Sequence, residues 1–243
     1  MQNIHTTYYV IHNTNMKHHI EFDIEFKPNP HKGLFVVLEG IDGSGKTTQC
    51  SAVAKRLQKE GMDAICTKEP TDGEIGSLIR KVLSQEVKVP ASSIQYLIAA
   101  DRAVHQEEVL SLLEKGKLVI SDRYFWSAVA YGTADKTDVS FENTAQVLMV
   151  SQSILSMYNQ FVLPDVSLYL DVSIDIAFSR LSQMDKEKEL YERKEKLERI
   201  DKGYKWLLSE FPDAFTKING EKSSEEVTDE IITAIKKKLS SRT

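Results

Sequence analysis

A glycine-rich stretch decides the fold of this 243-residue chain, and it reads Gly40-Ile41-Asp42-Gly43-Ser44-Gly45-Lys46-Thr47. The stretch follows the apolar run Leu34–Leu38 and opens a predicted helix that reaches about Glu60. Glycines in such a turn let successive backbone N–H groups point at phosphate oxygens, and the helix start adds the positive end of its dipole. Because strand, glycine turn and helix occur in this order, the sequence predicts a Walker A phosphate-binding loop, the P-loop.

Two side chains of the loop carry the chemistry. Lys46 brings an ammonium group to the β- and γ-phosphates, and the Thr47 hydroxyl is placed to ligate Mg²⁺. ATP is favoured over GTP because the chain contains no Asn-Lys-x-Asp guanine motif. The predicted ATP-binding residues are Gly40, Ile41, Asp42, Gly43, Ser44, Gly45, Lys46, Thr47 and Thr48.

From Gly33 onward, predicted strands alternate with predicted helices. The expected strands are 34–38, 64–67, 118–121, 166–170 and 214–218. The expected helices are 46–60, 74–85, 93–115, 141–159, 174–183 and 224–239. Alternation of this kind predicts an α/β fold with a parallel sheet covered on both faces. We expect a P-loop NTPase fold with a five-stranded parallel sheet and a helical lid from the charged residues at about 183–200.

Residues 1–32 differ from the rest and are expected to form an N-terminal extension to a domain that spans 33–243. Apolar and acidic residues alternate within residues 19–26, which predicts an extra strand, and two prolines follow it. Met16 is a candidate alternative start. The tract also holds five of the six histidines, but their spacing is irregular and no cysteine or carboxylate completes a metal site.

Composition and charge limit the classes of protein to which the chain can belong. The hydrophobic content of 41% allows one substantial core, and the net charge of −5 argues against broad binding to nucleic acid or to an anionic membrane. No apolar run approaches the ~20 residues of a membrane span, and the first residues lack the pattern of a secretory signal. Cys50 and Cys66 form no disulfide framework, so reduced thiols in a cytoplasmic protein are expected.

A second motif, Asp122-Arg123-Tyr124, follows the predicted strand 118–121. Groups just past the carboxyl ends of parallel strands line the ligand crevice, so Arg123 is expected to grip a phosphate near the P-loop. A structural ion pair with a helix carboxylate is the alternative for Arg123. Asp122 is placed like a Walker B acid that reaches Mg²⁺ through water.

Several segments together resemble the thymidylate kinase family. The segments are Val36–Gln49, Thr67-Lys68-Glu69-Pro70-Thr71, Ala99–His105, Asp122-Arg123-Tyr124 with Ser127 and Tyr131, Leu168–Val172, and Asn219-Gly220 with Glu225-Glu226-Val227. They occur in the family's order from about residue 33 to 240. The resemblance implies transfer of the γ-phosphoryl group from ATP to thymidylate (dTMP), with Mg²⁺ as the cofactor.

The resemblance also implies residue roles. Asp42 would accept a hydrogen bond from the 3′-hydroxyl of the nucleotide, Arg102 would contact the pyrimidine edge, and Tyr131 would pack where a 2′-hydroxyl would sit. The implied substrate-binding set is Asp42, Glu69, Arg80, Ile98, Arg102, Arg123, Ser127, Tyr131 and Tyr191. The implied catalytic set is Lys46, Arg123 and Arg180, and the implied metal-binding set is Thr47 with Asp122 through water.

Three positions depart from the family pattern. Leu190 replaces a lid arginine, and Gly43 stands where some members carry a P-loop arginine, so the source of the lid cation stays open. Ile98 replaces a phenylalanine that stacks on thymine, which keeps a kinase for dUMP, UMP or a purine monophosphate as an alternative. A P-loop ATPase switch is a further alternative. The apolar stretch Val147–Tyr158 is a candidate homodimer surface.

Overall fold

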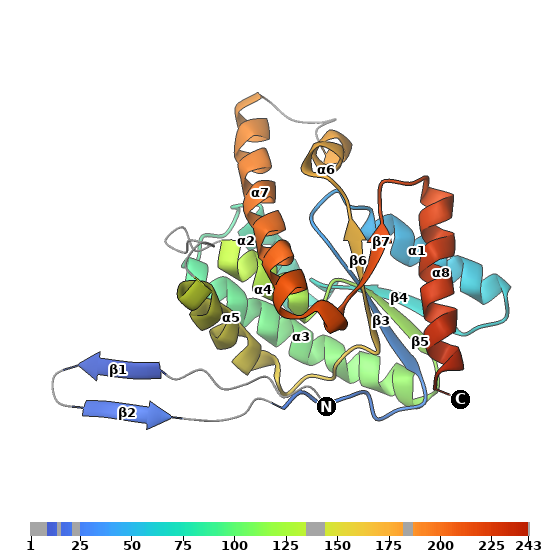
Figure 1. Ribbon diagram of the computed structural model, residues 1–243, viewed down its shortest axis with the longest axis horizontal. Coiled ribbons are helices and arrows are strands. Elements are labelled where there is room, and N and C mark those ends of the chain that lie inside the picture. The colour runs from blue at the N-terminus through green and yellow to red at the C-terminus, as the bar shows by residue number, and fades with distance from the viewer. Residues whose placement is uncertain (1–8, 14–15, 21–24, 135–143, 182–186, 243) are drawn as a thin grey trace.

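The computed structural model describes residues 9–13, 16–20, 25–134, 144–181 and 187–242, and its centre is a five-stranded parallel sheet (Figure 1). The sheet order is β4-β5-β3-β6-β7, so the strand before the P-loop is central. The strands are β3 (Leu34–Glu39), β4 (Ala64–Lys68), β5 (Leu118–Asp122), β6 (Val166–Asp171) and β7 (Thr216–Asn219). The predicted fold class is confirmed.

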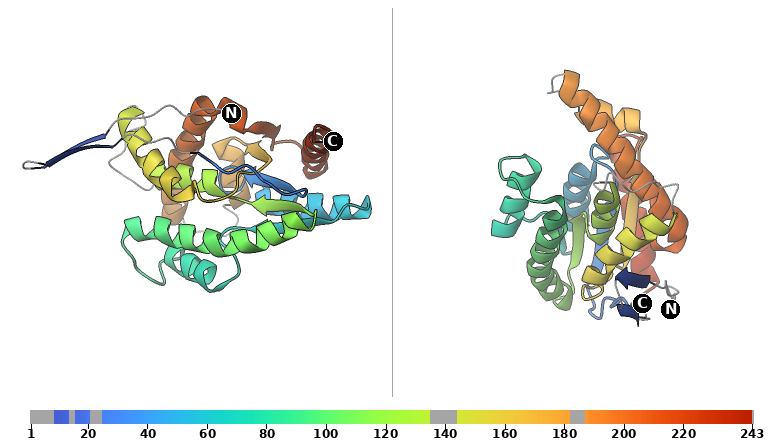
Figure 2. Two further views of the ribbon diagram at one scale, coloured as in Figure 1. Left: turned by 90° about the horizontal axis from the view of Figure 1, so that it is seen from below. Right: turned by 90° about the vertical axis from the view of Figure 1, so that its left-hand side faces the viewer.

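Helices cover both faces of this sheet (Figure 2). They are α1 (Lys46–Lys59), α2 (Glu74–Leu83), α3 (Ala91–Glu114), α4 (Phe125–Ala134), α5 (Thr144–Tyr158), α6 (Ile174–Leu181), α7 (Glu187–Glu210) and α8 (Ser224–Ser240), with a short 3₁₀ turn, η2 (Pro212–Ala214). Side chains alternate across β3, so Val36 packs with α1 and α8 while Phe35 packs with α3, α4, α5 and α7. The two faces therefore form two hydrophobic cores.

Helix α4 and strand β7 differ from the sequence-based expectation. Helix α4 was not predicted, because almost all of its residues are buried and apolar or small, which leaves no helical period to detect. The last strand begins at Thr216 instead of residue 214, since Pro212 starts a 3₁₀ turn that occupies the preceding residues.

The expected strand over residues 19–26 is wrong in its extent. The structure instead has an antiparallel hairpin of β1 (Tyr9–Asn13) and β2 (Met16–Ile20), which lies apart from the α/β body (Figure 1). Residues 21–24 lie outside the described part of the chain. Phe26 is not in a strand, and its ring stacks on Phe125 with centroids 5.9 Å apart. At Phe26, alternation of apolar and acidic residues did not predict a strand correctly, because this side chain packs on Phe125 instead.

The prediction of two reduced thiols is also wrong. Cys50 and Cys66 form a disulfide with their Cα atoms 5.7 Å apart. It links buried Cys50 on α1 to exposed Cys66 on the edge strand β4. The sequence could not reveal the bond, because it depends on which face of β4 carries residue 66.

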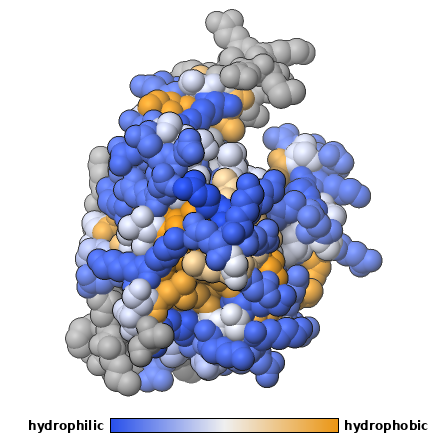
Figure 3. Space-filling model, turned by 90° about the vertical axis from the view of Figure 1, so that its right-hand side faces the viewer, coloured by the Kyte–Doolittle hydropathy of each residue, from blue (hydrophilic) through white to orange (hydrophobic). Residues whose placement is uncertain are grey.

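The side of the molecule that carries α8 is hydrophilic over most of its area, with hydrophobic residues gathered mainly in the lower half (Figure 3). Among the described residues, no helix is long and apolar enough to cross a membrane.

Candidate active site

The P-loop connects β3 to α1 and is closely packed against α6. Gly43 has a φ of +80°, a conformation that side chains rarely adopt. A Cβ at this position would lie 2.3 Å from the carbonyl oxygen of Ala177. The loop therefore requires glycine at position 43, and the arginine that some family members carry there would not fit this backbone.

Lys46 begins α1 and is almost fully buried beneath the loop. Its ammonium donates to the carbonyl of Ile41 at 2.7 Å and to the hydroxyl of Ser44 at 3.3 Å. Burial, and then the positive charge of Arg123, lowers the pKa of Lys46 to about 7. The Lys46 amine is therefore readily protonated when negatively charged phosphates bind next to it.

Thr47 and Asp122 meet because their strands are neighbours. Asp122 ends β5 directly beside Leu38 of β3, so its carboxylate faces the first turn of α1. The Thr47 hydroxyl donates to one oxygen, Oδ2 of Asp122. The other oxygen, Oδ1, is buried without a hydrogen-bond partner. A hydroxyl and a carboxylate with an unsatisfied oxygen fit the hard, oxygen-ligated Mg²⁺ ion.

Arg123 has a φ of +76°, which is unusual for a residue with a side chain. Its backbone N–H donates to Leu38, and its carbonyl accepts from the Ser121 hydroxyl at 2.7 Å. The guanidinium donates to Asp42, to the Tyr131 hydroxyl at 2.9 Å, to Ser127 at 3.1 Å and to the Gly40 carbonyl at 3.3 Å. The backbone conformation thus directs a fixed cation at the P-loop.

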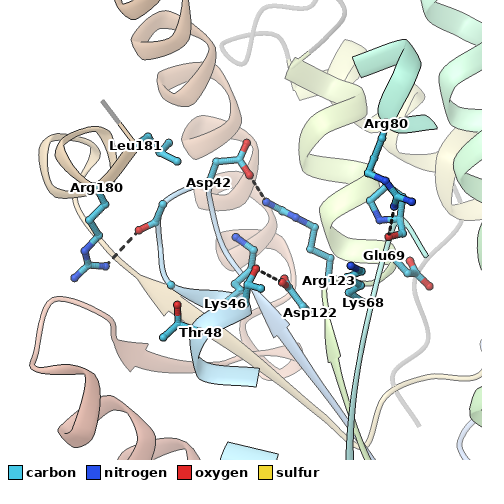
Figure 4. A pocket seen from close by; sticks show the side chains of 14 residues that line it. Asp42, Lys46, Thr48, Lys68, Glu69, Arg80, Asp122, Arg123, Arg180 and Leu181 are labelled. Atoms are coloured by element: carbon cyan, nitrogen blue, oxygen red, sulfur yellow. Dashed lines mark hydrogen bonds and ion pairs between the residues drawn. The ribbon is translucent and has the colours of Figure 1, made fainter. Parts of the chain in front are cut away.

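These groups surround a cavity of about 660 Å³. The lining residues are Asp42, Gly43, Gly45, Lys46, Thr47, Thr48, Lys68, Glu69, Pro70, Arg80, Asp122, Arg123, Arg180 and Leu181. Arg180 lies on one side of the P-loop and Arg80 with Glu69 on the other, with Lys46 and Arg123 between them (Figure 4). Four lysine and arginine side chains besides Lys46 therefore face one space, which suits two polyanionic ligands.

Helix α3 holds the loop that forms one wall of the cavity. Arg102 donates to Glu69 at 2.6 and 2.8 Å, and its guanidinium lies over the rings of Tyr124 and Tyr158, 5.0 and 4.4 Å from their centroids. His105 contacts the other Glu69 oxygen at 2.9 Å and the Thr67 hydroxyl at 2.7 Å. Burial alone would raise the pKa of Glu69, but Arg102 and His105 lower it below its usual value. Glu69 is therefore an ionised, rigidly held carboxylate.

The site thus combines a P-loop, a carboxylate and hydroxyl suited to Mg²⁺, and a second set of cations beyond the loop. The thymidylate kinase family model matches residues 38–231 of the chain. The chain belongs to the thymidylate kinase family. As a member it is a nucleoside monophosphate kinase, which confirms the predicted class of enzyme.

Individual relatives of the kinase agree with the family match. A probable thymidylate kinase from Pyrococcus horikoshii is 35% identical over 221 residues, which cover 86% of this chain and 98% of the relative. Its counterpart from Pyrococcus abyssi is 38% identical with the same coverage. A thymidylate kinase from Leptospira borgpetersenii is 33% identical over 204 residues, which cover 83% of this chain and 92% of the relative.

Most residues that the sequence assigned to the kinase site lie together. Ser127 and Tyr131 contact Arg123 without being among the residues that line the cavity. Arg102 and Ile98 are also outside the lining, since Arg102 is buried against Glu69 and Ile98 packs on the core. The side chains of Tyr191 and Leu190 lie outside the described part of the chain.

Two of the predicted cations are bound to backbone carbonyls. Arg180 donates to Gly43 at 3.3 Å and to Gly220 at 3.0 Å, so it joins the P-loop to the loop after β7. Arg80 donates to Pro70 and to Thr71, the latter at 2.6 Å. Both line the kinase cavity, and both would need to exchange these contacts for phosphate oxygens in a complex.

Three buried groups near the kinase site, Glu39, His105 and Tyr204, have no role predicted from the sequence. Glu39 is fully buried and accepts hydrogen bonds from Ser127 and Tyr204, while burial raises the pKa of its carboxyl. A charged residue that ends an otherwise apolar strand is the one signal that could have marked Glu39. Tyr204 had no such signal, because it lies 165 residues away in a charged helix.

Proposed function

We propose that the chain transfers the γ-phosphoryl group of ATP to dTMP and releases dTDP and ADP, with Mg²⁺ as the cofactor. The observation that carries the proposal is the placement of Arg123, a fixed cation on the far side of the P-loop from Arg180. The P-loop would bind the phosphates of ATP, and Arg123 would hold the phosphate of the acceptor. Family membership supports thymidylate as that acceptor.

No strong general base is required for this reaction. The phosphate monoester of the acceptor has a second pKa near 6, so it is largely dianionic at neutral pH. The remaining task is to align two polyanions and to neutralise charge on the phosphoryl group during transfer. Lys46 would serve the γ-phosphate and Arg123 the acceptor, while Arg180 would reach the ATP side of the cavity.

Thr47 and Asp122 are the residues that would hold Mg²⁺, Thr47 directly and Asp122 through water. The ion would supply positive charge that offsets the negative charge of the phosphate groups during transfer. The unsatisfied Oδ1 atom of Asp122 supports this assignment. We expect Asp122→Asn to weaken the response of the reaction rate to added Mg²⁺ more than it weakens dTMP binding.

Three nucleotide-facing assignments belong to the same proposal. Asp42 would bind the 3′-hydroxyl, Tyr131 would exclude a 2′-hydroxyl, and Glu69 would lie between the acceptor phosphate and the metal. The contacts of Asp42 and Tyr131 with Arg123 support a shared site for the sugar and its phosphate. Arg102 and Ile98 would face the base, although Arg102 now lies against Glu69.

A panel of acceptors with ATP and Mg²⁺ tests the proposal. We expect dTMP to give the highest kcat/KM, dUMP to exceed UMP, and ATP hydrolysis without acceptor to be slow. A preference for UMP or a purine monophosphate would favour the alternative kinase that Ile98 leaves open. Rapid hydrolysis that no nucleotide accelerates would favour an ATPase switch.

We also propose that the protein works in the cytoplasm on these small molecules, without nucleic acid or membrane partners, and that α5 contributes to a homodimer. Sedimentation of the purified chain would test the dimer, since a monomer at all concentrations would contradict it.

A further inference from the structure

Three oxygen-bearing side chains from three elements meet behind Arg123. The Ser127 hydroxyl of α4 and the Tyr204 hydroxyl of α7 both donate to the same oxygen, Oε2, of Glu39 at the end of β3, and the Tyr204 contact is 2.9 Å. The two hydroxyl oxygens are 2.8 Å apart. Glu39 and Tyr204 are 0% exposed and Ser127 is 6% exposed, so the cluster is closed to water.

The hydroxyl protons determine which groups in this cluster donate hydrogen bonds and which accept them. Each hydroxyl has one proton, and Glu39 accepts both, while its other oxygen accepts from the backbone N–H of Tyr124 at 3.2 Å. Ser127 is then left with lone pairs only, and it accepts from the Arg123 guanidinium at 3.1 Å. Glu39 therefore holds Ser127 in its orientation toward Arg123, and Tyr204 contacts both the Glu39 oxygen and the Ser127 oxygen.

Tyr204 reaches this cluster because α7 packs closely on α4. A Cβ at Gly203 would lie 2.8 Å from the Ala130 carbonyl, so only glycine permits this approach. The Tyr204 ring also packs on Tyr169, with centroids 5.2 Å apart. The same helix begins at Glu187, inside the stretch that the family resemblance assigns to the lid.

We propose that Tyr204 is a positioning residue whose hydroxyl orients the Arg123 guanidinium through Glu39 and Ser127. Binding of the acceptor phosphate is thereby coupled to helix α7. The inference rests on the proposed function, in which Arg123 holds that phosphate. Tyr204 does not line the cavity, and it acts only through the two side chains that it contacts.

Tyr204→Phe in the full chain tests the proposal, because it removes one hydroxyl and keeps the ring. We expect the dTMP KM to rise about three- to tenfold, as the loss of one hydrogen bond would give, with the ATP KM within about twofold of the parent value. Tyr169→Phe is the matched control: the backbone of this buried tyrosine pairs with that of Glu39 in the sheet, but its hydroxyl has no described hydrogen bond to Ser127 or Glu39. It should leave both KM values within about twofold.

A double-mutant cycle with Ser127→Ala separates positioning from loss of stability. If both residues act through Arg123, Tyr204→Phe will change the dTMP KM little in the Ser127→Ala background. Independent effects that multiply, a Tyr204→Phe enzyme with parental kinetics, or equal rises in both KM values would each overturn the proposal. Thermal unfolding followed by circular dichroism establishes that the variants are folded.

The outcome also distinguishes this inference from the proposed function. A parent enzyme that phosphorylates another monophosphate but not dTMP contradicts the proposed substrate alone. The same cycle is then run with that acceptor, because the cluster acts on the phosphate and not on the base. A parent enzyme that phosphorylates no monophosphate contradicts both proposals.

Discussion

Lys46 shows how a single buried side chain can report on ligand binding. Its pKa of about 7 compares with 10.5 for an ordinary lysine, so near pH 8 the side chain is largely neutral. Between about pH 7 and 10.5 the unfolded chain holds a proton that the folded chain has released. The contribution of Lys46 to the free energy of unfolding therefore increases with pH in this window.

Binding of ATP should return that proton to Lys46. We expect uptake of up to one proton per ATP at pH 8, because the phosphates favour the charged form. Calorimetric titrations in two buffers of different ionisation enthalpy measure the uptake. Lys46→Arg keeps a permanent charge and should reduce the uptake, and an unchanged value in that variant would argue against Lys46 as its source.

Arg123 is predicted to matter for the acceptor more than for ATP. Arg123→Ala should weaken dTMP binding by roughly ten- to a hundredfold, since a hydrogen bond to a charged group contributes about 1.5–3 kcal/mol. ATP affinity should change little. Separate calorimetric titrations of dTMP and of a non-hydrolysable ATP analogue check this, and an equal fall in both affinities would place Arg123 on the ATP side instead.

At the scale of elements, side chains of helix α3 hold the loop that follows β4. Asp101 accepts from the backbone N–H and the hydroxyl of Thr71 at 2.8 and 2.6 Å, while Arg102 and His105 hold Glu69. Three residues within two turns of one helix thus fix a loop that lines the cavity. Contacts from α3 therefore help to set the position of this loop.

Removing the Glu69 charge should therefore destabilise the protein in a pH-dependent way. Glu69→Gln leaves the buried Arg102 without its counter-ion, which typically costs about 3–5 kcal/mol. Because the folded-state pKa of Glu69 is lowered from 4.5, this stabilisation is complete above pH 4.5 and is lost as the pH falls through the folded value. Urea unfolding at pH 7 and pH 3 should show a smaller difference between parent and variant at pH 3.

Sequence reasoning predicted the elements that have a local signature. The P-loop and the strand before it follow from neighbouring residues, and the Asp122-Arg123 pair follows from the end of an apolar strand. Helix α4 lacked a period, and the disulfide and the Glu39–Tyr204 contact join residues far apart in sequence. The left-handed conformation of Arg123 was equally hidden, since the backbone hydrogen bond to Leu38 that helps to hold it is tertiary.

At the scale of the whole molecule, the kinase domain begins earlier than the P-loop strand suggests. Phe26 stacks on Phe125, and the Asn29 side chain donates to Gly33 at 2.8 Å and to Asp165 at 2.7 Å. The segment from residue 26 is therefore part of the packed body. The hairpin before it has few described contacts with that body.

One truncation and one substitution test this division. Deletion of residues 1–24 should change the free energy of unfolding by less than about 0.5 kcal/mol and leave kcat/KM for dTMP unchanged. Phe26→Ala in the full chain should cost about 3–5 kcal/mol if the site cannot collapse, and less if it can. Urea unfolding of both variants gives the comparison. A large loss on deletion of 1–24 would show that the hairpin is part of the stable fold.

The far end of the chain closes on the same segment. Arg242 is the last residue but one of the sequence. Its guanidinium donates to the carbonyls of Gly33 at 2.8 Å and His31 at 3.1 Å. The N-terminal and C-terminal ends of the domain therefore lie close together, which is the condition for circular permutation. A short linker could join residue 242 to residue 26, and new ends could be opened at the exposed turn of Gly61 between α1 and β4. The disulfide between α1 and β4 would then link the new ends covalently. A permuted enzyme could therefore carry reporter domains beside α1.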